Sequence, residues 1–217
     1  WYGKGPGVDR CGDVFKHANM AGSAKHGGVL VLAGDDHAAK SSTIPHQSDH
    51  QFSAAMMPVL YPSSVQEILD LGLHGYMMSR LSGLWVGLKI VTNVAAGSGT
   101  ANVDPARLNF VTPDLMFDGK AFAPTMNLGM NVRAEALEME QSLYTRRLEV
   151  AKRYAAANKL NNVVFDNPDA WLGIITAGKT YNDLRQCFLE LGLDDAALRR
   201  YGIRILKMGM LFPMEPQ

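Results

Sequence analysis

The residues best able to carry chemistry gather within the first fifty positions of this chain. Five of the six histidines and several carboxylates lie there. An apolar run over residues 29–33 leads directly into the polar sequence Asp35-Asp36-His37. Open α/β sheets bind ligands in the crevice beyond the carboxyl ends of their strands. An apolar run followed by a polar run therefore predicts a ligand-binding loop at the end of a buried strand.

The residue spacing of this loop disfavours two other kinds of site. Three histidines and two aspartates are conceivable metal ligands, namely His37, His46, His50, Asp36 and Asp49. Their spacing matches no known cluster such as HExxH, so a hydrogen-bonded loop is favoured over a metal site. Ser41 and Ser42 lie near His46 without the GxSxG pattern of a nucleophile elbow, which disfavours a hydrolase. Adjacent buried carboxylates repel when both are ionised, so we expect hydrogen bonds or solvent at Asp35 or Asp36.

Two glycine-containing segments could receive an anion, and for each a plain turn is the alternative. The first, residues 3–7 (GKGPG), could cradle a phosphate with backbone amides while Lys4 adds positive charge. It is neither a GxGxxG sequence after a strand nor a P-loop. The second, residues 173–179 (GIITAGK), is typical of a strand that leads through a glycine turn to a helix N-terminus, where anions are stabilised.

The composition disfavours several classes of partner. The formal net charge is +0, so there is no electrostatic case for a nucleic-acid or an anionic membrane partner. No apolar run approaches the ~20 residues that span a bilayer. Cys11 and Cys187 are too few for a disulfide framework or an iron–sulfur cluster, which favours a reducing, cytoplasmic location.

The elements that must position the loop alternate between strands and helices. Apolar runs predict strands over residues 29–33, 58–61 and 83–91 and a short helix over 49–57. Ser64 and Glu67 have capping-box spacing at the start of a helix predicted over 64–80. A strand, a helix and a strand joined by short turns predict a right-handed parallel βαβ layout.

The rest of the chain predicts a connection and then a second unit. Residues 95–134 lack a clear period, which indicates an inter-domain connection with a strand near 107–111. An amphipathic helix over 134–157 precedes strands over 162–166, 171–176 and 203–208 and helices over 180–191 and 194–201. This alternation predicts a second parallel α/β unit. Because the chain begins without methionine and both ends look cut, we expect a piece of a larger polypeptide.

Six segments together resemble one known family. They are WYGKGPGVDR, HGGVLVLAGDDH, KSSTIPHQSDH, VLYPSSVQEILD, LGIITAGKTYNDLRQ and YGIRILKMGMLFPMEP. Over essentially its whole length the chain resembles the indolepyruvate ferredoxin oxidoreductase family, most closely the large single-chain versions. These are thiamine-diphosphate-dependent 2-oxoacid:ferredoxin oxidoreductases. The resemblance implies oxidative decarboxylation of an arylpyruvate such as indolepyruvate, with coenzyme A, to an acyl-CoA, carbon dioxide and reduced ferredoxin.

The resemblance implies an α/β fold of parallel-sheet, three-layer units. Residues 1–95 then correspond to the C-terminal part of a thiamine-diphosphate pyrimidine-binding domain. Residues 96–149 correspond to a linker and connecting helix, and residues 150–217 to part of a transketolase C-terminal-like domain. For the full-length enzyme the resemblance implies a homodimer with pyrophosphate-binding and ferredoxin-like domains, which holds thiamine diphosphate, magnesium and iron–sulfur clusters.

The same resemblance implies roles for individual residues of the loop. Lys4 and His46 are the catalytic candidates, because either could orient the 2-oxoacid carboxylate or assist proton transfer. The candidates for cofactor binding are Gly5, Gly7, Asp9, Asp36, His37, Ser41, Ser42 and Gln47. No residue is assigned to a metal.

Several parts of the family pattern are absent from this sequence. The chain has neither the Val-Asn-Glu-like motif of the activating glutamate nor a cysteine-rich ferredoxin segment. Gly34-Asp35-Asp36 lacks the final glycine of the GDG…N motif that holds magnesium and diphosphate. We therefore expect this chain alone to hold no cofactor and to be inactive. The alternative function is a non-catalytic α/β assembly module that binds a nucleotide or coenzyme A.

Overall fold

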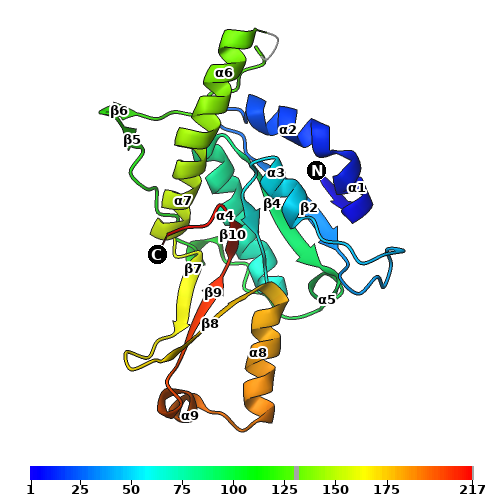
Figure 1. Ribbon diagram of the computed structural model, residues 1–217, viewed down its shortest axis with the longest axis vertical. Coiled ribbons are helices and arrows are strands. Elements are labelled where there is room, and N and C mark those ends of the chain that lie inside the picture. Colours follow the sequence, from blue (N-terminus) through cyan, green and yellow to red (C-terminus); the bar gives the residue numbers. More distant parts are fainter. Residues whose placement is uncertain (130–131, 217) are drawn as a thin grey trace.

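The computed structural model describes residues 1–129 and 132–216, and its centre is a five-stranded sheet (Figure 1). The strands are β1 (Tyr2–Lys4), β2 (Val29–Asp35), β3 (Val59–Leu60), β4 (Trp85–Val91) and β10 (Met210–Phe212). They lie in the order β1-β2-β4-β3-β10, with the first four parallel and β10 antiparallel to β3. Asp35 pairs with Val91, so β2 and β4 end at the same edge of the sheet.

Helices cover both faces of this sheet and give the three layers that the family resemblance implies. On one face, α1 (Gly5–Arg10), α2 (Gly12–Ala21) and α3 (Asp49–Ala54) enclose a core that includes Phe15, Val31 and Phe52. On the other face, α4 (Val65–Ser82) and α7 (Leu148–Ala157) pack over Leu60 and Val86. An α/β fold built on parallel strands is thus confirmed.

The helix α4 begins where its sequence predicts and ends at Ser82, two residues beyond the predicted end at residue 80. The Ser64 hydroxyl accepts the Glu67 amide hydrogen, and Gly83 closes the helix in the left-handed region at a φ of 77°. The Glu67 carboxylate differs from the expected capping box, because it accepts the amide of Ser63 at 2.7 Å instead of the amide of Ser64. A short turn, α5 (Thr92–Ala95), follows β4.

The connection differs from the prediction at residues 107–111, where the structure has no strand. A 3-10 turn, η1 (Pro105–Arg107), precedes this segment, and a small hairpin of β5 (Met116–Phe117) and β6 (Lys120–Ala121) follows it. The Asn158 amide replaces a strand partner, because it binds both the N–H and the C=O of Val111 at 2.9 and 2.8 Å. The predicted helix 134–157 is confirmed as α6 (Arg133–Ser142), a π-turn η2 (Leu143–Arg147) and α7, which form one rod in Figure 1.

The second sheet is mixed, not fully parallel as predicted. Its strands are β7 (Asn161–Phe165), β9 (Ile203–Met208) and β8 (Leu172–Ala177), in that order. β8 is parallel to β9, whereas β7 is antiparallel to it. The helices α8 (Gly178–Glu190) and α9 (Asp195–Arg200) pack with this sheet around Phe165, Phe188 and Ile205. After β9 the chain continues through Gly209 into β10, so the last strand joins the central sheet.

The N-terminal glycine segment forms a strand end and a helix start. Residues 3–7 close β1 and begin α1, in whose first turn Pro6 lies. The sequence pattern predicts neither α1 nor α2. Across residues 1–129 and 132–216, no helix is long and apolar enough to cross a bilayer.

Candidate functional site

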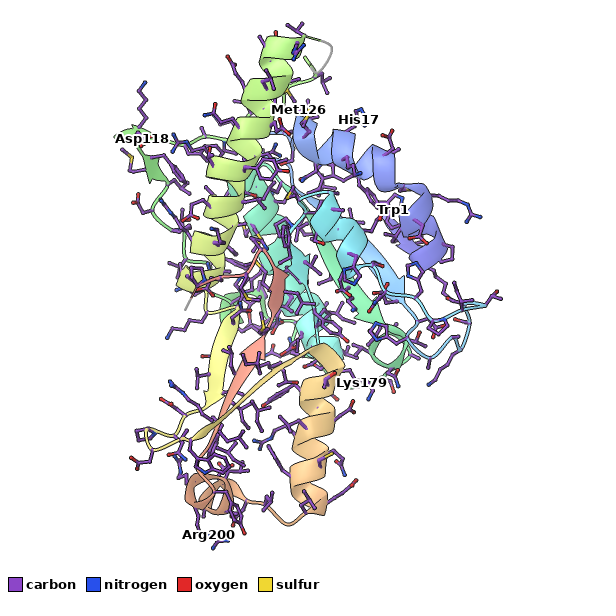
Figure 2. The ribbon with its side chains drawn as sticks, in the orientation of Figure 1. Trp1, His17, Asp118, Met126, Lys179 and Arg200 are labelled. Atoms are coloured by element: carbon purple, nitrogen blue, oxygen red, sulfur yellow. The ribbon has the colours of Figure 1, made fainter. Side chains whose placement is uncertain are left out.

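Polar residues from the first fifty positions lie together with Lys89 at the carboxyl edge of the central sheet. Lys4 ends β1, Asp35 ends β2 and is followed by Asp36, and Lys89 lies near the end of β4. Loop 36–48 leaves β2 at this edge and returns to α3. In Figure 2, Lys179 marks the start of α8, which lies near the same ends of the central strands.

Asp36 folds the first half of the loop around its carboxylate. It accepts the backbone amides of Lys40, Ser41 and Ser42 at 2.9, 2.7 and 3.0 Å. These bonds, that of Ser41 foremost, lower the pKa of Asp36 to about 2, although burial opposes them. The backbone of Asp36 also accepts the His46 amide at 3.0 Å, which closes the loop. Asp36 thus stays ionised and orders the loop.

Lys4 reaches across from β1 to this loop. Its ammonium group donates to Ser41 Oγ at 2.6 Å and lies 3.9 Å from Asp36 Oδ2. The Lys4 side chain remains 44% exposed. An ammonium group carries three hydrogens, so Lys4 is oriented by the loop and can still bind an anion from solvent.

His46 is packed beneath the first turn of α1. Its Nε2 lies 3.0 Å from Asp9 Oδ2, and its side chain is 11% exposed. A methyl group on Gly5 would lie 1.9 Å from His46 Nδ1, so the imidazole ring fits only because residue 5 is glycine. His46 Nδ1 is buried without a hydrogen-bond partner among the described residues, 3.9 Å from Asp35 Oδ1. The Asp9 side chain is exposed, so the hydrogen bond to Asp9 links the largely buried ring to the surface.

The remaining predicted residues divide into two groups. Ser42 is buried in the loop, and Gly7 lies against the Trp1 ring beside Lys4 and Gly5. His37 and Gln47 are exposed, and the structure does not bring them into the hydrogen-bonded cluster. Their assignment to cofactor binding remains a proposal.

Two residues of the cluster were not predicted as part of the site. Asp35 is fully buried and accepts the Ser48 amide at 2.8 Å and the Ser48 hydroxyl. Lys89 is buried in β4 and donates to Asp49 Oδ2 at 2.6 Å. A signal for Lys89 is present in the sequence, because it is a lone charge within the apolar strand Trp85–Val91.

The second glycine segment, residues 173–179, folds as predicted into a strand that leads into a helix. Gly178 adopts a φ of 50° at the start of α8. A methyl group on Gly178 would lie 2.3 Å from the Tyr61 ring, so a side chain of the central unit packs against this helix N-terminus. Burial raises the pKa of Tyr61 to about 12, which keeps its hydroxyl neutral.

A metal site does not form from the described residues. Within residues 1–129 and 132–216, no group of three histidine, cysteine, aspartate or glutamate side chains could hold a metal ion. Asp36 is engaged by backbone amides and Asp35 by Ser48.

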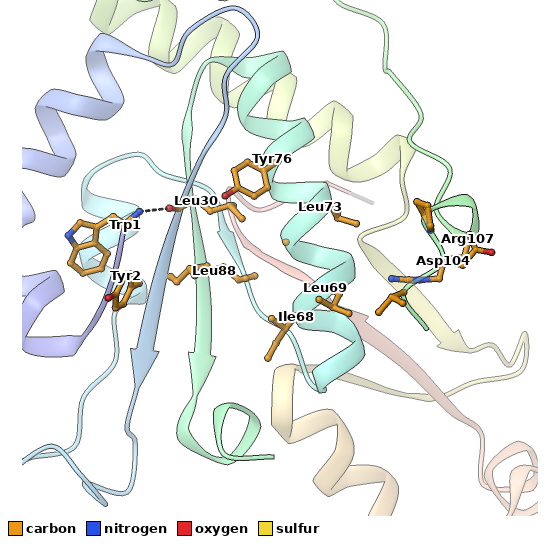
Figure 3. A pocket seen from close by; sticks show the side chains of 14 residues that line it. Trp1, Tyr2, Leu30, Ile68, Leu69, Leu73, Tyr76, Leu88, Asp104 and Arg107 are labelled. Carbon is orange, nitrogen blue, oxygen red and sulfur yellow. Dashed lines mark hydrogen bonds between the residues drawn. The ribbon is translucent and has the colours of Figure 1, made fainter. Parts of the chain in front are cut away.

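A separate cavity of about 490 Å³ lies away from this cluster (Figure 3). It opens between one face of the central sheet and α4, with Leu30 and Leu88 on the sheet and Leu73 on the helix. Arg107 at its rim pairs with Asp70. None of the candidate site residues lines it.

Comparisons with known proteins find relatives along almost the whole chain. Residues 161–217 match the family model "Indolepyruvate ferredoxin oxidoreductase middle domain". The "Indolepyruvate oxidoreductase subunit IorA" of Methanothermobacter marburgensis is 27% identical over 207 residues, which cover 95% of this chain and 31% of that protein. The protein of the same name from Archaeoglobus fulgidus is 25% identical over 188 residues, which cover 87% of this chain and 27% of that protein. The chain thus spans about a third of the length of these curated relatives.

A solved structure shares the fold of the chain. It is the 2-oxoglutarate:ferredoxin oxidoreductase from Magnetococcus marinus, with 2-oxoglutarate, coenzyme A and succinyl-CoA bound. The match has a TM-score of 0.61 at 16% sequence identity and covers 98% of this chain and 42% of that chain. At this identity the likeness supports the fold.

Proposed function

We propose, from its confirmed resemblance to the indolepyruvate ferredoxin oxidoreductase family, that this chain is part of an enzyme that oxidatively decarboxylates an arylpyruvate. The carboxyl edge of its central sheet forms one wall of the substrate and cofactor cleft. The observation that carries this proposal is the convergence of Lys4, loop 36–48 and His46 at that edge. In open α/β sheets this edge is where ligands bind.

The domain assignment is part of the proposal. Residues 1–95 are the C-terminal part of the pyrimidine-binding domain, and residues 96–149 are the connection. Residues 150–217 are the beginning of the transketolase C-terminal-like domain. The family match over 161–217 supports a unit of its own in this last region.

Lys4 is the residue of this wall that binds the 2-oxoacid. Its exposed ammonium group, oriented by Ser41, attracts the substrate carboxylate. Asp36 holds Ser41 through the backbone and so fixes the direction of Lys4. His46, paired with Asp9, borders the same wall and holds or moves a proton at Nε2.

Thiamine diphosphate would supply the stabilised carbanion for decarboxylation in the complete enzyme. The described residues do not fit its magnesium–diphosphate part, because they contain no metal-binding cluster. The two cysteines, Cys11 and Cys187, lie on α1–α2 and α8 and are not a cluster site. We place the anchors of these cofactors in other domains of a homodimeric, cytoplasmic enzyme.

Activity of the complete oxidoreductase that contains this chain tests the proposal. We expect Lys4→Met to raise KM for the 2-oxoacid about tenfold or more, because a charge-assisted hydrogen bond is lost. His46→Gln is expected to lower kcat, and the pH dependence of kcat should change with it. Lys16→Met and His17→Gln are matched controls on the exposed face of α2, where His17 also contacts a carboxylate, that of Asp13.

Wild-type kinetics in both site variants would contradict the assignment of this wall. A complete protein that turns over no 2-oxoacid but binds coenzyme A or a nucleotide would favour the assembly module instead.

A further inference from the structure

Lys89 is a buried cation at the centre of the carboxyl edge. It is 4% exposed, and its neighbours in β4 are largely apolar. Its ammonium group lies 2.6 Å from Asp49 Oδ2, 3.7 Å from Asp35 Oδ2 and 4.8 Å from the centroid of the Tyr61 ring. Burial of an ammonium group is costly unless it is paired. These partners pair the Lys89 ammonium group inside the fold.

The two carboxylates that Lys89 contacts lie at the two ends of loop 36–48. Asp35 is the last residue of β2, directly before the loop, and Asp49 is the first residue of α3, directly after it. Asp35 also accepts both the amide and the hydroxyl of Ser48. One cation on the neighbouring strand therefore joins the exit and the return of the loop.

We propose that Lys89 is a positioning residue that holds loop 36–48 by its two ends. Within the loop, Ser41 contacts Lys4 of β1, and His46 packs against Gly5 of α1. Its interior is organised by Asp36, but the hydrogen bonds of Asp36 lie within the loop and do not fix its ends to β4. The exit of the loop is also held to β4 by the pairing of Asp35 with Val91, and the Thr92 hydroxyl donates to the Asp35 carbonyl at 3.1 Å. Lys89 adds the link from β4 to the return of the loop at Asp49. What the loop binds rests on the proposed function, whereas its attachment to β4 does not.

The charges around Lys89 determine which variant separates its effect on the loop from its effect on the stability of the whole domain. Lys89→Met keeps the length of the stem but leaves the carboxylates of Asp35 and Asp49 without their cation, which destabilises the whole domain. One Asp49 oxygen is already buried without a partner among the described residues. The double variant Lys89→Met/Asp49→Asn removes one carboxylate charge together with the cation. It should recover much of the global stability without restoring the link to the loop.

Amide hydrogen exchange of the 217-residue chain, measured together with its thermal melt, tests the proposal. We expect the amides of Ser41, Ser42 and Ser48 to exchange at least tenfold faster in Lys89→Met and in the double variant. The melting temperature should fall in Lys89→Met and rise again in the double variant. Amides within β2 and α4 should keep their relative protection, and the exposed Lys16→Met should behave as the wild type.

Two results would overturn the positioning role. One is wild-type protection of the loop amides in both Lys89 variants. The other is joint recovery of loop protection and melting temperature in the double variant, because a role limited to charge balance predicts that joint recovery. If Lys89→Met does not fold, exchange of the loop amides in the double variant alone tests the positioning role. Exchange needs neither substrate nor turnover, so failure of the proposed function through Lys4 and His46 would leave this result unaffected.

Discussion

Two adjacent aspartates at the end of β2 show how residues of one type acquire different roles. Asp36 accepts three backbone amides of its own loop, whereas Asp35 accepts Ser48 and lies near Lys89 of the next strand. The sequence predicts that a buried carboxylate here needs hydrogen bonds, and both have them. It does not predict the partner of Asp35, because Lys89 is brought close only by the pairing of β2 with β4.

Gly5 gives the sharpest prediction at the scale of a single residue. In Gly5→Ala the new methyl group would overlap the His46 ring, so the ring must move and the contact with Asp9 is lost. We expect a decrease of about 1–3 kcal/mol in the free energy of unfolding, which is typical of overpacking. Urea unfolding measures it, and the NMR shifts of the His46 ring report the displacement.

Gly99→Ala is the matched control, because nothing lies within 4 Å of a methyl group there. Its free energy of unfolding should stay within about 0.5 kcal/mol of the wild type. Equal stability of the two variants, with unchanged His46 shifts, would show that the ring is not packed beneath Gly5.

At the scale of elements, the sequence predicts those with a clear period and caps. The helix predicted over 64–80 and the strands predicted over 29–33 and 83–91 are confirmed as α4, β2 and β4. The prediction of a strand near 107–111 is wrong. The Asn158 side chain forms hydrogen bonds with the backbone N–H and C=O of Val111, so this segment needs no neighbouring strand. The helix α1 was missed because glycine is a poor helix former, and its packing against the sheet stabilises it instead.

The π-turn η2 places Arg147 where it ties three elements together. Its guanidinium group donates to Asn19 and Met20 at the end of α2 and to Ser82 and Gly83 at the end of α4. Burial lowers the pKa of Arg147 to about 10, so it stays charged at neutral pH. A cation at two helix C-termini is also favoured by both helix dipoles.

Arg147→Met is expected to lower the free energy of unfolding by about 3–5 kcal/mol, because four buried carbonyl groups lose their donor. Chemical denaturation measures this change. Arg146→Met is the control, since Arg146 pairs with the exposed Asp118 and should contribute at most about 1 kcal/mol. Similar losses in both variants would contradict the structural role of Arg147.

At the scale of the whole molecule, the two sheets are joined by contacts that no local pattern predicts. β10 pairs with β3, and Asn182 of α8 donates to the Ser63 carbonyl at 2.7 Å. Lys207 of β9 donates to Ser63 Oγ at 2.9 Å and pairs with Glu67. The sequence predicts both units but not their junction, because these partners are brought together only by the tertiary fold.

A substitution at Gly178 tests this junction between the two sheets directly. In Gly178→Ala the methyl group would lie 2.3 Å from the Tyr61 ring, in addition to the strain of a positive φ. We expect a loss of about 1–3 kcal/mol from the contact and about 1–2 kcal/mol from the backbone. Gly192→Ala carries only the backbone cost, because its φ is 67° and nothing lies within 4 Å. Equal thermal destabilisation of the two variants would show that α8 does not pack on Tyr61.

The central claim is that Lys4 and loop 36–48 form a wall of a 2-oxoacid site. A structure of the complete oxidoreductase with a 2-oxoacid bound tests it most directly. We predict the substrate carboxylate at the carboxyl edge of the central sheet, about 2.7–3.2 Å from Lys4 Nζ. A substrate bound elsewhere, for example in the apolar cavity beside α4, with the Lys4 ammonium still held by Ser41 alone, would contradict it.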